Sequence, residues 1–101
     1  MNNLLSSNVV GLPSTQPFPS AFAILRRKQV QIETGYSRST IYLRITEGLW
    51  PKPVSLGPRA VGWPAREVAA INEARIAGWP DAKIRALVLE LAAQRTAGGA
   101  R

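Results

Sequence analysis

The spacing of apolar residues predicts a small, mainly helical domain with one β-hairpin. Ile41 and Ile45 lie one helical turn apart, so a helix over residues 38–47 would turn both side chains toward a core. Residues 54–56 and 60–63 read as the two strands of a hairpin. Near the C-terminus, apolar residues recur at i, i+3, i+4 and i+7, which predicts one apolar stripe along a helix. The stripe consists of Ile84, Leu87, Val88 and Leu91.

Two of the predicted helices meet at a tight turn. Gly35 tolerates the positive φ that ends a helix over residues 27–34, and Ser37 can accept hydrogen bonds from the free N–H groups of the next helix. Tyr36 would pack in the angle between the two helices. Gly48 would end the second helix in the left-handed conformation. This order of signals is typical of a helix-turn-helix.

Prolines and tryptophans set the limits of the remaining elements. A short strand over residues 23–25 precedes the first helix, and the prolines of the Trp50–Pro53 segment hold it extended. Two Gly-Trp-Pro units predict helix starts with proline at the first helical position, which gives helices from Pro64 and from Pro80. We expect the three tryptophans to pack in the core or at hinges between elements.

Three blocks of the sequence, taken in order, are similar to a known family: Thr34–Tyr42, Pro51–Val54 and Leu56–Trp63. They resemble the AlpA family of phage and prophage regulators, small winged relatives of the MerR-type DNA-binding domain and of phage excisionases. The resemblance extends from about Ile24 to about Ala77. It implies a mainly α fold with a small β-wing, a MerR-like winged helix-turn-helix in which the hairpin is the wing.

The resemblance also implies a function. Members of this family act on double-stranded DNA near the promoters of mobile-element genes, often the genes for integration or excision. We therefore expect a sequence-specific transcriptional regulator of phage or prophage genes. Two alternatives remain open: an excisionase-like architectural factor that bends a recombination site, and a helix-turn-helix structural or packaging adaptor.

The distribution of charge agrees with binding to DNA. The chain has 13 Lys and Arg against 6 Asp and Glu, a net charge of +7. Residues 23–66 carry eight basic and two acidic side chains, a net of +6, whereas residues 67–101 carry five and four, a net of +1. The excess positive charge therefore lies on the segment that resembles a DNA-binding domain, as a polyanionic partner requires. The alternative is an ordinary solvated surface.

The chain divides into four parts by composition. Residues 1–22 contain no charged side chain and lack the basic start and continuous apolar run of a secretory signal, so we predict a flexible leader. The DNA-binding domain would span residues 23–78, the amphipathic helix residues 79–97 and a tail residues 98–101. The absence of cysteine and of a long apolar run favours a reducing cytoplasm and no membrane. The family resemblance implies that this cytoplasm is bacterial and that the protein lies at the nucleoid.

The outward face of the predicted recognition helix supplies the candidate base contacts. Arg38 at its start suits bidentate binding of guanine, and the hydroxyls of Ser39 and Thr40 suit phosphates or base edges. Tyr42 or Leu43 would meet a thymine methyl group. In the alternative reading, the two hydroxyls only support the helix start, Tyr42 is half-buried and Leu43 seals a contact within the domain.

Five further cations are candidate phosphate contacts, which position a protein on DNA without reading its sequence. Arg59 at the hairpin tip would reach the backbone or a narrow minor groove, and Arg44 would extend from the edge of the core. Arg27 and Lys28 open the first helix, and Lys52 precedes the wing. Each of these charges, taken alone, is also compatible with simple solvation.

Catalysis and cofactor binding have no support in the sequence. The chain has no His or Cys, its six carboxylates are scattered, and it contains no P-loop, dinucleotide fingerprint or metal-ligand cluster. We therefore expect no enzyme, cofactor, metal or small-molecule substrate. The expected partners are duplex DNA and a second copy of the chain, which would pair through the C-terminal stripe unless that stripe folds back on its own domain.

Overall fold

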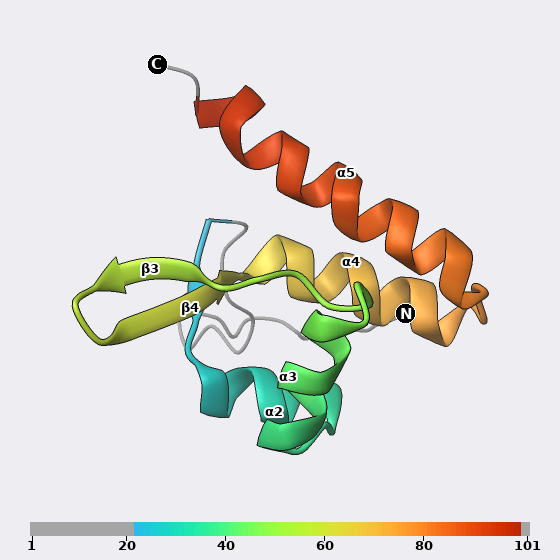
Figure 1. The fold of residues 1–101 in the computed structure, drawn as a ribbon, viewed down its shortest axis with the longest axis horizontal. Helices are drawn as coiled ribbons and strands as arrows, with labels where there is room; N and C mark the ends of the chain where they lie inside the picture. The colour runs from blue at the N-terminus through green and yellow to red at the C-terminus, as the bar shows by residue number, and fades with distance from the viewer. Residues whose placement is uncertain (1–21, 100–101) are drawn as a thin grey trace, which may run out of the picture.

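The computed structural model describes residues 22–99, and side chains as far as residue 96. Within that range the chain forms four helices and a small antiparallel sheet (Figure 1). The predicted leader, apart from Phe22, and the end of the predicted tail lie outside the described residues. The elements in chain order are β2 (Ile24–Leu25), α2 (Arg27–Thr34), α3 (Arg38–Thr46), β3 (Val54–Gly57), β4 (Ala60–Pro64), α4 (Ala65–Ile76) and α5 (Asp81–Gly99).

Helices α2 and α3 form the predicted helix-turn-helix. Gly35, with φ of 77°, ends α2 in the left-handed conformation, and its N–H donates to the Gln31 carbonyl at 2.8 Å. The Ser37 hydroxyl accepts the N–H of Thr40 at 3.2 Å and so caps α3. At the far end of α3, Gly48 again takes a φ of 77°. The helix-turn-helix of the expected fold class is therefore confirmed, with its boundaries close to those predicted.

The wing is a hairpin of β3 and β4, and β2 pairs with the other edge of β4. Strand β2 packs closely on β4 at Gly62, where a Cβ atom would stand 2.5 Å from Cγ2 of Ile24 and 3.0 Å from the carbonyl oxygen of Leu25. Only a glycine allows β2 to approach this closely. The expected winged helix-turn-helix is thus complete, with the hairpin projecting beyond the helices in Figure 1.

In both Gly-Trp-Pro units the proline lies one residue before the helix, and not at the first helical position as predicted. Pro64 is the last residue of β4, pairs with Ile24, and precedes α4 instead of occupying its first turn. Its φ of −58° and ψ of 133° are extended because the sheet pairing continues to this point. Likewise Pro80 lies before α5, and its carbonyl accepts the N–H groups of Lys83 and Ile84. Proline here takes the capping position and not the first helical position.

Two of the three tryptophans form the centre of the core, as predicted. Trp50 and Trp63 are fully buried, and the indole N–H of Trp63 donates to the Pro51 carbonyl at 2.8 Å. The Tyr36 ring packs edge-on against Trp50, with ring centroids 6.0 Å apart, so it fills the angle after the turn. Trp79 is partly exposed, and the Lys83 ammonium group lies 4.3 Å from the centre of its ring.

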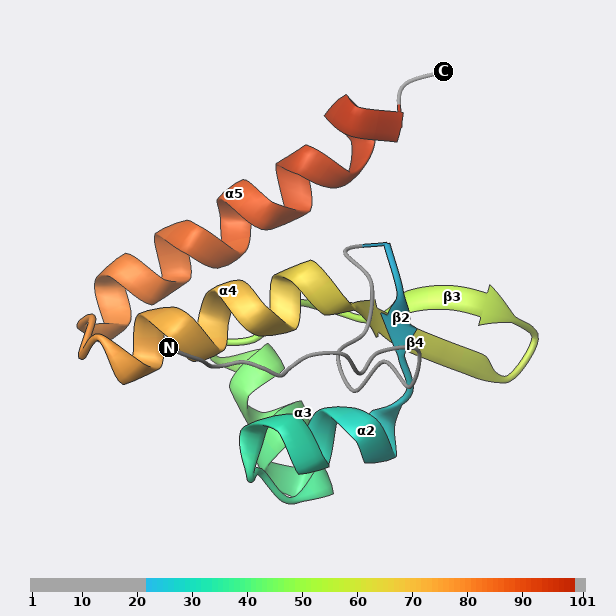
Figure 2. The ribbon, with the colours of Figure 1, turned by 180° about the vertical axis from the view of Figure 1, so that it is seen from behind.

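Helix α5 folds back along α4, as Figures 1 and 2 show from opposite sides. Three members of the C-terminal stripe are buried in the same core as the tryptophans, and the fourth packs against it. The stripe therefore folds back on its own domain, which is the alternative to pairing with a second copy that the sequence left open. A domain of about eighty residues has little core to spare and needs this apolar area itself. The buried members are Ile84, Val88 and Leu91, and the partly buried one is Leu87.

A buried ion pair also joins α5 to the rest of the domain. Glu67, in the first turn of α4, is 0 % exposed, and Arg95 donates to both of its carboxylate oxygens, at 2.6 and 2.8 Å. Arg95 donates further to the Lys52 carbonyl at 2.8 Å. The hydrogen bond to Glu67 raises the pKa of the Arg95 guanidinium above its ordinary value. Nothing in the sequence pattern had indicated this pair.

We predict that Gly62→Ala lowers the free energy of unfolding by about 1–3 kcal/mol, because the added methyl group overlaps Ile24 and the Leu25 carbonyl. Thermal unfolding followed by circular dichroism measures the change. Adding Ile24→Ala removes the nearest atom and should restore part of the stability. A single Gly62→Ala chain as stable as the parent would show that β2 does not pack this closely on β4.

We predict that Arg95→Ala lowers the free energy of unfolding by about 3–5 kcal/mol, since it leaves the Glu67 carboxylate buried without a partner. Urea unfolding measures this loss. The double variant Glu67→Met with Arg95→Met replaces the pair with apolar groups of similar size and should recover most of it. A loss below about 1 kcal/mol for Arg95→Ala would be typical of a surface pair and would contradict the buried one.

Candidate nucleic-acid interface

One face of α3 is free of contacts with the core. Ile41 is fully buried and Ile45 packs against the core, whereas Ser39, Leu43 and Thr46 are exposed, Leu43 to 52 %. A leucine half-open to solvent on a helix whose opposite side is buried is available for contact with a partner. The structure therefore places Leu43 on the face predicted to read DNA, and does not use it to seal a contact within the domain.

The hydroxyl groups at the start of α3 bond to one another. Ser37 Oγ donates to Thr40 Oγ1 at 2.9 Å while accepting the Thr40 N–H, and it lies 3.3 Å from Ser39 Oγ. These hydrogen bonds support the helix start, which is the alternative left open for Ser39 and Thr40. Ser39 remains exposed, so its hydroxyl is accessible to a ligand as well.

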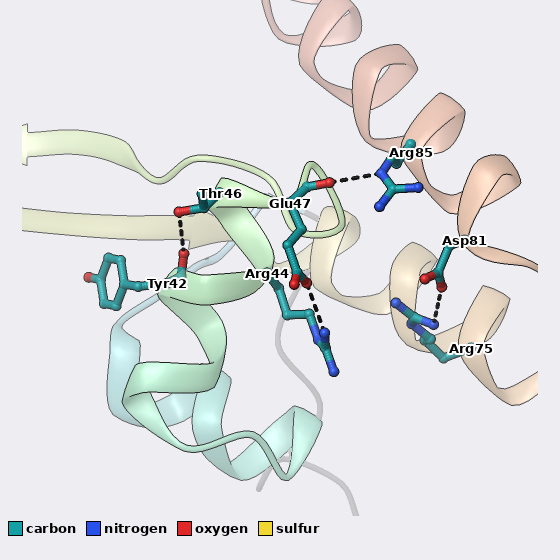
Figure 3. A network of polar contacts seen from close by, with 7 residues as sticks. All are labelled: Tyr42, Arg44, Thr46, Glu47, Arg75, Asp81 and Arg85. Carbon is teal, nitrogen blue, oxygen red and sulfur yellow. Dashed lines mark hydrogen bonds and ion pairs between the residues drawn. The ribbon is translucent and has the colours of Figure 1, made fainter.

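Tyr42 links the recognition helix to the wing. Its ring packs edge-on against Trp63 with centroids 6.4 Å apart, and the residue is 39 % exposed. Its carbonyl accepts the Thr46 hydroxyl at 3.1 Å (Figure 3). Tyr42 is thus half-buried, as in the alternative left open by the sequence, with its ring against the core tryptophan of the wing.

Arg44 lies on the opposite side of α3 from Tyr42, as Figure 3 shows. Its guanidinium pairs with the Glu47 carboxylate at 2.8 Å and lies 6.0 Å from the centre of the Tyr36 ring. The hydrogen bond to Glu47 raises the pKa of Arg44, which is therefore charged at all accessible pH. The predicted phosphate contact would therefore be made by a guanidinium whose charge is already paired with the carboxylate just after α3.

Three predicted DNA contacts come together at the start of the helix-turn-helix. Arg27, Lys28 and Arg38 line one open hollow of about 530 Å³ between α2 and the start of α3. Arg27 is held there by the side-chain carbonyl of Gln31, at 2.7 Å. Three cations around one open surface attract phosphate more strongly than any one of them alone. The hollow is completed by Gln31, Ile32 and Tyr36.

The other two predicted phosphate contacts lie along the wing. Arg59 is exposed beside the hairpin tip, and Lys52 is exposed just before β3. The sequence pattern indicated no role for Arg26, the N-cap residue of α2, whose Nε–H donates to the Val61 carbonyl of β4 at 3.0 Å. Arg26 thus holds the helix-turn-helix against the wing. The sequence carried no signal for this bond, because its partner is a backbone group 35 residues away.

Two classes of site are absent from the described residues. Between residues 22 and 99, no three His, Cys, Asp or Glu residues gather closely enough to hold a metal ion. Over the same range, none of the helices has the length and hydropathy needed to cross a bilayer.

Comparison with known proteins identifies the family. The family model for the prophage CP4-57 regulatory protein AlpA matches residues 23–83. The chain belongs to the AlpA family. The resemblance carried by the three sequence blocks is therefore confirmed.

Among curated relatives, the uncharacterized protein ORF88 of Enterobacteria phage P4 is 48 % identical over 54 residues, which are 54 % of this chain. The match spans 61 % of that protein, so this AlpA-family chain covers about three fifths of the relative's length. No solved structure matches the chain.

Proposed function

We propose that this AlpA-family chain is a sequence-specific, double-stranded DNA-binding regulator of phage or prophage transcription. One observation carries the proposal: the exposed face of α3 begins at Arg38, which shares an open hollow with Arg27 and Lys28. A capped helix with a free outer face and clustered cations at its start suits insertion into a major groove beside phosphates. A regulatory and non-enzymatic role agrees with the family.

Each group has a distinct task in this proposal. Arg38 binds guanine, Leu43 meets a thymine methyl group, and the Ser39 hydroxyl reaches a base edge or phosphate. The remaining contacts neutralise phosphates and set the register of the protein on the duplex. These contacts come from Arg27 and Lys28 in the hollow and from Lys52 and Arg59 along the wing.

Binding measured over a range of salt concentrations tests the function as a whole. Sequence-specific recognition keeps a preference for one duplex at high salt, whereas a purely charged contact loses all duplexes alike. Mapping the DNA bound in cells supplies the duplex and separates a promoter-bound regulator from a factor at a recombination site. A chain with no preferred duplex in either measurement would favour the adaptor role.

We predict that Arg38→Ala weakens binding to the mapped operator by about 1–3 kcal/mol and relaxes its sequence preference, because one bidentate base contact is lost. Titration of operator and random duplexes measures both effects. Arg66→Ala, which removes an equal charge from an exposed position on α4, is the matched control and should leave the preference intact. Equal losses on operator and random DNA would contradict base reading by Arg38.

We predict that Arg59→Ala weakens binding on all sequences alike and flattens the slope of log K against log salt by roughly 1, as for one lost phosphate contact. Thermal stability should not change, since Arg59 is exposed at the wing tip. An unaltered salt slope would place the wing away from DNA.

A further inference from the structure

The segment that connects the recognition helix to the wing is part of the core. Residues 48–53 run from the end of α3 to the start of β3. Leu49, Trp50 and Pro51 within it are buried, and the Pro51 carbonyl accepts the Trp63 indole N–H. Whatever holds the two ends of this segment therefore helps to place α3 and the wing relative to each other, together with the Tyr42–Trp63 contact.

Helix α5 holds both ends. At the first end, Arg85 Nε–H donates to the Glu47 carbonyl at 2.8 Å, as drawn in Figure 3. At the second end, Arg95 donates to the Lys52 carbonyl, also at 2.8 Å. The two arginines are ten residues apart on one helix, a separation of about 15 Å. A single rigid element thus binds the carbonyl next to each of the two parts proposed to touch DNA.

The first of these bonds acts at the point where α3 is easiest to reorient. The Glu47 carbonyl is one of the terminal groups that a helix leaves unpaired and partly negative, so a guanidinium is favoured there. The next residue, Gly48, has a left-handed backbone, and a Cβ placed on it would meet Cγ and Cδ of Arg85 at 3.7 Å. Arg85 therefore both bonds and covers the joint after the recognition helix.

We propose that Arg85 is a positioning residue for DNA recognition, and that α5 sets the angle and spacing between the recognition helix and the wing. The inference rests on the proposed DNA-binding function. Arg85 touches no base or phosphate in this proposal and acts through α3. A helix that points a few degrees away loses base contacts first, because their geometry is strict, while phosphate contacts adjust.

This role differs from a contribution to stability alone. Arg85 is an exposed side chain. When it is removed, water can bond to the Glu47 carbonyl in its place, so the domain should still fold. Arg85 is also no acid's partner in the described part of the chain, where the ion pairs involve Arg44, Arg75 and Arg95. Its loss leaves no buried charge, in contrast to the loss of Arg95.

The first test compares full-length Arg85→Ala with Arg66→Ala, which removes the same charge elsewhere. Arg85→Ala should lower the ratio of operator to random-duplex affinity by roughly five- to tenfold, the net effect of one hydrogen bond of ordinary strength. The slope of log K against log salt should equal that of Arg66→Ala. A ratio equal to that of Arg66→Ala, or a slope flattened by a lost phosphate contact, would overturn the positioning role.

The second test needs no DNA. Because the chain lacks cysteine, spin labels can be attached at Leu43→Cys on α3 and Arg59→Cys on the wing. The distance distribution between them should broaden or shift when Arg85→Ala is added, and should not change with Arg66→Ala. Arg95→Lys, which keeps a cation opposite Glu67 but lacks the guanidinium fork, should also alter the distribution.

The two tests separate the failure of this inference from the failure of the proposed function. A parent chain without any duplex preference would refute the proposed function, and the spin-label distances would still decide the role of α5. A parent chain that selects its operator, together with unchanged distances and an unchanged affinity ratio in Arg85→Ala, would refute the inference alone.

Discussion

The fold depends on one buried carboxylate. Glu67 is fully shielded from solvent at the start of α4, where an unpaired charge would be strongly unfavourable. Arg95 satisfies both oxygens and extends to the Lys52 carbonyl, so α4, α5 and the segment before the wing meet at a single ion pair. Because its counter-charge comes from the last helix, the winged helix-turn-helix is complete only when α5 is in place. Ile84 of α5 is buried in the same core, so the apolar packing of the domain also requires α5.

The sequence predicted those parts of the fold that short-range interactions determine. The cap at Ser37 and the left-handed turns at Gly35 and Gly48 involve groups no more than five residues apart, so their signals stand together in the chain. Arg95 meets Glu67 across 28 residues, and Arg85 meets the Glu47 carbonyl across 38. Neither arginine lies near its partner in the sequence, so only the tertiary fold reveals these two contacts.

The candidate site was predictable to a similar extent. Helical periodicity from Ile41 correctly placed Leu43 on the open face, because a helix side opposite a buried residue must face outward. The hydrogen bonds among Ser37, Ser39 and Thr40 were foreseen only as an alternative, since a hydroxyl suits both a cap and a ligand. Arg44 and Glu47 stand at i and i+3, a spacing that allows an ion pair on a helix. This pair competes with the phosphate contact predicted for Arg44.

The use of the C-terminal stripe inside the domain changes what recognition would require. A dimer formed through that stripe would hold two recognition helices at a set distance and read paired half-sites. With Ile84, Val88 and Leu91 buried within one chain, these residues no longer define such a distance. In the proposed DNA-binding role, each copy then contributes one recognition helix and one wing, and its selectivity depends on how firmly these two are held together. Helix α5, which carries this stripe, supplies that hold through a guanidinium at each end of the segment between them.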